Sequence, residues 1–372
     1  MHDAQPDGVQ EQIKGVHPST IPYLVPFLKL GKHTPGGVLT SGGPNGGALV
    51  YVKPAPTVRE SAMQRQPPGV RPTTPTESAP PLGRYYDVGG RRLLLHRSGS
   101  GSPAVVFLAG GGTIGLDYLN VQERAAEFTT SVLYDRAGTG WSDRAGLPRS
   151  SAEVTDELRE LLRTAGVPAP YLLVGHSLGG FYARHYARRF PDEVAGLLLL
   201  DPAHEDYNAY MPQQLVEIWN AWDPDQTLPD ELPDELIQFY RGLFAQEMTD
   251  WPEEIREPLI EYHVSLEGLK IGSQEASNLG QLNDELRQAG MPDVPLIVLT
   301  ATGIDSFKRA VSQGTPESLL HEEIEGKRRL YTALAESVSR GENRLVDDAG
   351  HVTITFRRPD AVLQAIRDLL GR

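Results

Sequence analysis

Residues 171–187 read YLLVGHSLGGFYARHYA, and this stretch decides the fold of the chain. A short apolar run typical of a buried strand ends at Gly175, and an apolar pattern with the helical period begins after Ser177. Ser177 therefore lies on a strand-to-helix turn, where the flanking glycines leave room for a strained backbone. Such a turn exposes the serine hydroxyl and aims the N–H of Leu178 at an oxygen that becomes negative when the serine attacks a carbonyl. The stretch predicts Ser177 as a nucleophile and Leu178 as an oxyanion donor.

A second stretch, residues 134–143, reads YDRAGTGWSD. Together with the G-H-S-L-G-G of the turn, it makes the chain from residue 82 to residue 372 resemble the α/β-hydrolase superfamily, in its capped serine hydrolase branch. The resemblance implies a mostly parallel sheet of about eight strands with helices on both faces, plus a helical cap inserted into it. It specifies no substrate. Serine at the turn argues against epoxide or haloalkane hydrolysis, for which members of this superfamily use aspartate there.

The remainder of the chain alternates strand and helix patterns. Predicted strands cover 84–88, 91–97, 104–109, 131–135, 171–175, 196–200, 296–301 and 344–346, and predicted helices cover 117–128, 151–165, 178–190 and 359–370. The first two strands, split by two glycines, indicate an antiparallel hairpin. The later alternation predicts a parallel α/β sheet covered on both faces. Reactive residues are then expected at the carboxyl ends of the strands.

Composition divides the chain near residue 82. Residues 1–82 hold 14 of the 30 prolines and 10 of the 38 glycines, which is typical of an arm or linker. Two apolar segments, 21–28 and 48–52, leave open whether this arm packs against the main domain. We predict a hydrolase core at 83–201 and 291–372, interrupted by a helical cap at 202–290.

A serine hydroxyl needs a base, and histidine suits that task near neutral pH. His351 follows the strand 344–346 and precedes the final helix, which is where this fold places its base. The base needs a carboxylate to orient it. Asp305, after the strand 296–301, is the predicted acid. Asp201, at the end of the preceding strand, stays open as the alternative, because the chain order of serine, acid and histidine permits both.

The loop after the strand 104–109 is Gly110-Gly111-Gly112. In the family this loop supplies the second oxyanion donor, and glycines let backbone N–H groups approach a ligand closely. The resemblance implies Gly111 as that donor, with Gly110 as the alternative.

The predicted cap is acidic and rich in tryptophan. Residues 205–261 contain 15 acidic and 2 basic residues, and they hold three of the four tryptophans. An amphipathic lid with carboxylates in water explains this composition. An apolar substrate pocket would also use such aromatics. We therefore predict Trp219, Trp222 and His204 as candidate substrate contacts.

The sequence shows no motif or composition typical of a metal site, a cofactor site, nucleic-acid binding, a membrane span or secretion. The chain has no cysteine and no metal-protease, P-loop or dinucleotide motif, so no metal or cofactor is predicted. The formal charge of −14 argues against nucleic-acid binding. No apolar window is long enough to span a membrane, and the N-terminus lacks the features of a signal peptide, so a cytoplasmic protein is expected.

These observations predict a serine hydrolase that cleaves a carboxylic ester or lactone through an acyl-enzyme intermediate, with a bulky, apolar small molecule as substrate. An amidase or aminopeptidase would use the same triad. Acyl transfer without hydrolysis, and ligand binding without turnover, stay open as further alternatives. The sequence does not define an oligomeric state.

Overall fold

The computed structural model of the protein describes residues 79–220 and 231–371. Most of the predicted N-terminal arm, and Trp222, lie outside these residues. Eight strands form one sheet: β1 (Arg84–Val88), β2 (Arg91–Ser98), β3 (Ala104–Leu108), β4 (Ser131–Tyr134), β5 (Tyr171–His176), β6 (Val194–Leu200), β7 (Leu296–Ala301) and β8 (Gly341–Val346). Their order is β1-β2-β4-β3-β5-β6-β7-β8, antiparallel where β2 pairs with β1 and β4, and parallel elsewhere. The predicted fold class is confirmed.

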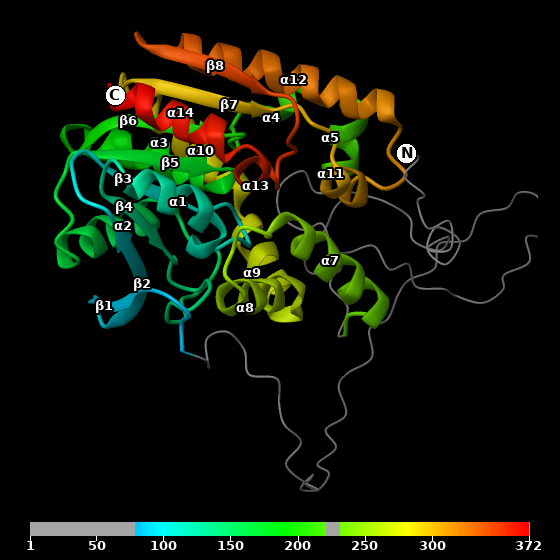
Figure 1. Ribbon diagram of the computed structural model, residues 1–372. Coiled ribbons are helices and arrows are strands. Elements are labelled where there is room, and N and C mark those ends of the chain that lie inside the picture. The colour runs from blue at the N-terminus through cyan, green and yellow to red at the C-terminus, as the bar shows by residue number, and fades with distance from the viewer. Residues whose placement is uncertain (1–78, 221–230, 372) are drawn as a thin grey trace, which may run out of the picture.

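From β3 on, helices follow the strands in the described part of the chain (Figure 1). They are α1 (Leu119–Ala126), α2 (Ser151–Thr164), α3 (Leu178–Arg189), α4 (Tyr207–Tyr210), α5 (Gln213–Asn220), α7 (Asp234–Glu247), α8 (Glu253–Val264), α9 (Leu266–Ala276), α10 (Leu279–Ala289), α11 (Ser306–Val311), α12 (Glu317–Glu336), α13 (Ile354–Arg357) and α14 (Pro359–Leu369), with two 3-10 turns, η2 (Gly115–Tyr118) and η3 (Pro191–Glu193). Sequence signals fix several helix ends. Ser150 caps α2 reciprocally with Glu153, for example, which satisfies backbone groups that the first turn leaves open.

The sheet is buried on both faces. Along β3, Val105 and Phe107 join one hydrophobic cluster, whereas Val106 and Leu108 join another. Because successive side chains of a strand point to opposite faces, these clusters are the two sides of the sheet. Helices α1 and α14 belong to the first side, and α2, α3 and α12 belong to the second. This two-layer cover holds the carboxyl ends of the parallel strands rigidly at one edge.

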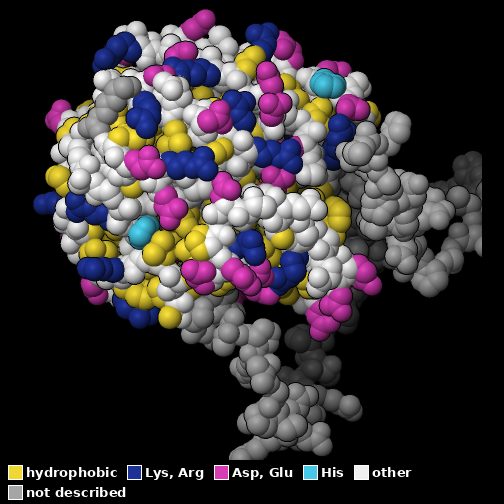
Figure 2. All heavy atoms as spheres, in the orientation of Figure 1, with side chains coloured by type: hydrophobic (Ala, Val, Ile, Leu, Met, Phe, Trp, Pro, Cys, Tyr) yellow, Lys and Arg dark blue, Asp and Glu magenta, His cyan; other side chains and the backbone are white. Residues whose placement is uncertain are grey.

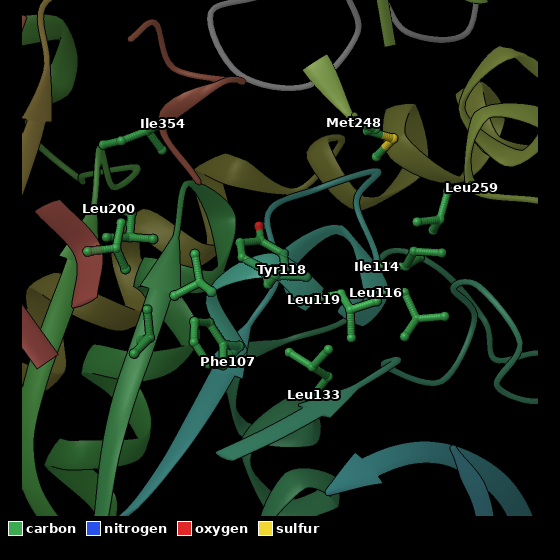
Figure 3. Packing of buried hydrophobic residues seen from close by; sticks show 14 of the residues in the cluster. Phe107, Ile114, Leu116, Tyr118, Leu119, Leu133, Leu200, Met248, Leu259 and Ile354 are labelled. Atoms are coloured by element: carbon green, nitrogen blue, oxygen red, sulfur yellow. The ribbon is translucent and has the colours of Figure 1, made fainter. Parts of the chain in front are cut away.

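The insertion between β6 and β7 contains α4 to α10. Its helices α7, α8 and α9 gather beside the sheet (Figure 1). Figure 3 shows Met248 and Leu259 of the insertion close to Ile114 and Leu116 of the loop after β3, and all four belong to one buried cluster. By contrast, Leu282 and Leu286 of α10 belong to the cluster on the other face. The insertion is thus integrated into both hydrophobic layers of the sheet.

Several elements differ from the sequence expectation, among them β8 and α12. β8 begins at Gly341, three residues before the predicted start. The 20-residue helix α12 was not predicted. Its inward face carries Glu323 and Lys327, both buried, so charged residues interrupt the apolar stripe by which a helix is recognised in sequence.

The surface mixes charges of both signs. Figure 2 shows basic and acidic side chains interleaved over the face in view. No helix in the described part of the chain is long and apolar enough to cross a membrane.

Candidate active site

Ser177 sits on a strained turn between β5 and α3. Its backbone angles are φ 52° and ψ −120°, which a residue with a side chain adopts only where the surroundings enforce it. The surroundings do so here, because the Ser177 N–H donates to Leu200 O at 3.1 Å and Ala203 N–H donates to Ser177 O at 2.9 Å. The turn is also tight, since a Cβ on Gly179 would lie 2.0 Å from Leu108 O. Within the described residues the buried Ser177 hydroxyl has no hydrogen-bond partner.

His351 contacts Asp201. The imidazole Nδ1 lies 2.7 Å from Asp201 Oδ2, and because a carboxylate only accepts, Nδ1 donates. A neutral imidazole in this tautomer has its basic lone pair on Nε2. Asp201 directly follows β6 at a positive φ of 39°, and its side chain is fully buried.

Lys327 and the hydrogen bond from His351 keep Asp201 ionised. Burial by itself would raise its pKa, but Lys327 and His351 outweigh this effect and hold the pKa of Asp201 well below its usual range. Lys327 Nζ lies 3.0 Å from Oδ1 and 2.9 Å from Oδ2 of the carboxylate. The N–H of Ala301 also donates to Oδ1, at 3.0 Å. The carboxylate therefore has donors at both oxygens.

Asp305, the acid preferred from the sequence, lies in a different environment. Its carboxylate accepts the N–H of Lys308 at 2.8 Å, the N–H of Gly350 at 2.8 Å and the hydroxyl of Thr353. The Asp305 side chain caps helix α11 and binds a backbone N–H of the loop before His351. The side chain of His351 is hydrogen-bonded to the alternative acid, Asp201, and not to Asp305. Both aspartates follow adjacent strands, and sequence spacing alone could not separate them.

His176 links the turn that carries Ser177 to the loop that carries His351. Its Nε2 donates to His351 O at 2.9 Å, so its Nδ1 accepts from the hydroxyl of Tyr118 at 2.7 Å. Burial, reinforced by the neighbouring His351, lowers the pKa of His176 to about 3. His176 is therefore neutral at ordinary pH, and it positions the main chain of the neighbouring loop.

The glycine loop after β3 lies against Ser177. A Cβ on Gly110 would come 3.3 Å from the Ser177 Cβ. The Gly110 N–H donates to Tyr118 Oη at 3.0 Å, so this N–H already has an acceptor. No hydrogen bond from the Gly111 N–H to another described residue is present. Leu178 is the first residue of α3, so its N–H has no acceptor within the helix. Gly111 and Leu178 thus both have an N–H available for an oxyanion.

A buried ion pair that sequence reasoning missed supports this loop. Arg136 donates to Ala109 O at 2.5 Å and to Gly110 O at 2.8 Å. Its guanidinium also contacts Glu275 of α9, at 2.8 Å, and Glu275 accepts the N–H of Gly112 at 2.8 Å. Both side chains are almost fully buried. Arg136 belongs to the YDRAG stretch, so an arginine beside a buried strand was the available signal, whereas nothing marked Glu275.

The predicted substrate contacts have partners of their own. The ring of Trp219 lies 5.2 Å from that of Tyr207 and packs on the cluster that includes α3 and α12. His204 Nδ1 accepts the N–H of Asp206 at 3.0 Å. Burial, with a further contribution from Arg184, lowers the pKa of His204 to about 4. His204 is therefore a neutral acceptor within its own loop.

Comparison with known proteins identifies the family of the chain. The model of the alpha/beta hydrolase family matches residues 105–365, which is more than half of the chain. The protein belongs to the alpha/beta hydrolase family.

Individual relatives match over shorter stretches. The chain is 28% identical over 136 residues to the uncharacterized protein YbdG of Bacillus subtilis, covering 36% of this chain and 40% of that protein. It is 37% identical over 105 residues to the human (lyso)-N-acylphosphatidylethanolamine lipase, covering 27% of this chain and 30% of the lipase. The chain thus spans less than half the length of these relatives.

A solved structure matches over a longer range. Cfl2 of Burkholderia cenocepacia superposes with a TM-score of 0.56 at 19% identity, covering 77% of this chain and 94% of that one. At this identity the match supports the fold alone.

Proposed function

We propose that this protein is a serine hydrolase that cleaves a carboxylic ester or lactone through an acyl-enzyme intermediate. The observation that carries the proposal is the strained Ser177, whose buried hydroxyl has no partner among the described residues. It lies next to a loop whose His351 is hydrogen-bonded to a buried carboxylate. Strain of this kind is retained where function requires it.

In the proposed reaction Ser177 Oγ attacks the carbonyl carbon and its proton passes to His351 Nε2. Asp201 holds Nδ1 and stabilises the imidazolium that forms. The negative oxygen of the tetrahedral intermediate accepts the N–H groups of Leu178 and Gly111. His351 then gives the proton to the leaving oxygen, and a water molecule activated by the same histidine releases the acyl group.

Two further elements belong to this proposal. Residues 202–290 would form the cap, with α7 to α9 beside the loop after β3, and this loop would carry the second oxyanion donor. The substrate would be a small molecule with an apolar acyl group. The similarity to a human lipase over 105 residues adds glycerophospholipid esters to the substrates worth testing.

The test is intact-protein mass after incubation with a small fluorophosphonate, which needs an activated serine and no knowledge of the substrate. We expect one adduct on the wild type and none on Ser177→Ala or His351→Ala. An adduct on Ser177→Ala, or none on a folded wild type, would contradict the proposal.

Substrate class is tested next. p-Nitrophenyl esters, lactones, glycerophospholipids and aminoacyl amides would be compared at equal concentration. Turnover of esters or lactones above amides supports the proposal, whereas turnover of amides alone identifies an amidase.

A further inference from the structure

Lys327 is a buried charged residue beside the proposed triad, and it was not predicted from the sequence. It lies on α12, its side chain is 5% exposed, and all three of its hydrogen bonds are internal. Two go to Asp201, at 3.0 and 2.9 Å, and the third goes to Ala301 O at 2.7 Å. An ammonium has three protons to donate, so Lys327 has none left for a substrate. Its role must be carried out through Asp201.

The whole inward face of α12 holds the loop that carries Asp201. Glu323, Lys327 and Tyr331 are spaced by four residues and therefore share one side of the helix. Tyr331 donates to Pro202 O at 2.6 Å. Glu323 accepts the hydroxyl of Tyr207 at 3.3 Å. Three successive helical turns thus bind residues 201–207.

The charge around Asp201 can be counted from each neighbouring element. Lys327 and Tyr331 face it from α12, His351 faces it from the loop after β8, and His176 lies beyond on β5. Glu323, one turn before Lys327, is matched by Lys308 at 2.6 Å. Asp201 and Lys327 therefore form a pair with no net charge, and His351 meets this pair instead of a lone carboxylate.

We propose that Lys327 is a positioning residue for catalysis: its ammonium fixes both oxygens of Asp201 and offsets the negative charge that this carboxylate presents to His351. This inference rests on the proposed function. It follows that the acidic limb of the pH–activity profile should depend on the charge at position 327, because the histidine must be unprotonated to accept the proton of Ser177.

The experiment is the pH dependence of the fluorophosphonate labelling rate in the wild type and in Lys327→Met, which removes the charge and keeps most of the side-chain volume. We expect the midpoint of the acidic limb to rise by about one pH unit, the size of effect that a charge within a few ångströms produces. The maximal rate is expected to fall about tenfold, because Asp201 is held less firmly.

Lys308→Met is the matched control. Lys308 is also a largely buried lysine in an ion pair, with Glu323, but it does not contact Asp201. Its midpoint should equal that of the wild type. Lys327→Arg, which keeps the charge, should also retain the wild-type midpoint.

An NMR titration of the His351 Cε1–H resonance supplies a readout that needs no activity. Its midpoint should shift in the same direction in Lys327→Met, or in Lys327→Gln where the first variant does not fold. Equal midpoints in the wild type and the charge-free variant, or an equal shift in Lys308→Met, would overturn the inference. If the folded wild type is not labelled at all, the proposed function fails, while the NMR titration still decides whether Lys327 acts on His351.

Discussion

Glu275, in the insertion, accepts the N–H of Gly112 in the loop after β3 at 2.8 Å. The same carboxylate contacts the buried guanidinium of Arg136, which in turn donates to two carbonyls of that loop. A residue from the insertion therefore helps to shape the backbone that is proposed to bind the oxyanion. Precise placement of such donors matters, because they act only when they are already aimed at the developing charge.

Glu275→Gln should lower the labelling rate and the rate of ester hydrolysis at least tenfold. The change leaves Arg136 with an uncompensated buried charge and loosens the loop that carries Gly111. The matched control is Glu267→Gln on the same helix, whose partner Arg144 is exposed. Steady-state kinetics of both variants, with thermal melts, checks this. Equal rates in the two variants would show that Glu275 does not support the oxyanion loop.

Asp201→Asn should reduce kcat by about 10³- to 10⁴-fold, because an amide stabilises the wrong tautomer of His351 and no imidazolium. Asp305→Asn should stay within about threefold of the wild type in rate, and should lose about 1–2 kcal/mol of stability with its helix cap. Kinetics and urea unfolding of both variants are the measurement. The reverse pattern, with the larger kinetic loss in Asp305→Asn, would restore Asp305 as the acid.

Gly179→Ala should abolish soluble expression or cost about 3 kcal/mol, because the added Cβ would lie 2.0 Å from Leu108 O. Gly242→Ala in α7 is the control: its Cβ meets nothing within 4 Å, so the helix should gain about 0.5–1 kcal/mol. Urea unfolding of the two purified variants distinguishes close packing from a general intolerance of alanine at helical glycines.

Acid should destabilise the protein partly through His204. Its pKa is lowered to about 4 in the folded state, mainly by burial, whereas an unfolded histidine titrates near 6.5. The unfolded state therefore binds more protons between these values, so stability falls as pH falls through this window, by about 2–3 kcal/mol between pH 7 and pH 4.5.

His204→Asn tests this contribution, since its amide oxygen can still accept the N–H of Asp206. Urea unfolding at pH 7 and pH 4.5 should show a smaller loss in the variant than in the wild type. Parallel losses would mean that His204 does not contribute, and other buried histidines, such as His176, would cancel in the comparison.

The fold and the turn at Ser177 could be predicted because they depend on the pattern of residues that are adjacent in the sequence. The change from strand to helix period around Ser177, and the turn glycines, are properties of adjacent residues. Which of the two aspartates contacts His351 does not depend on neighbouring residues in the sequence. Asp201 and Asp305 follow neighbouring parallel strands, and their carboxylates bind adjacent residues. Asp305 accepts the backbone N–H of Gly350, whereas Asp201 accepts the side-chain N–H of His351. Only the three-dimensional course of the loops separates these two contacts.

Helix α12 was missed for a related reason. A buried helix is recognised by an apolar stripe, yet its inward face carries Glu323 and Lys327, whose ion-pair partners are far away in sequence. The partners Lys308 and Asp201 become visible only after folding. Hydrophobic periodicity does not reveal buried charge pairs of this kind.

The contact between Glu275 and the loop after β3 limits how the insertion can be exchanged. Insertions are attractive targets for grafting a new specificity onto a fixed catalytic frame, since they connect two strands and leave the triad in place. A donor segment grafted between β6 and β7 of this protein would have to bring a carboxylate to the position of Glu275. A chimera without it would keep Ser177 but lose the support of the loop after β3, unless Arg136 were replaced at the same time.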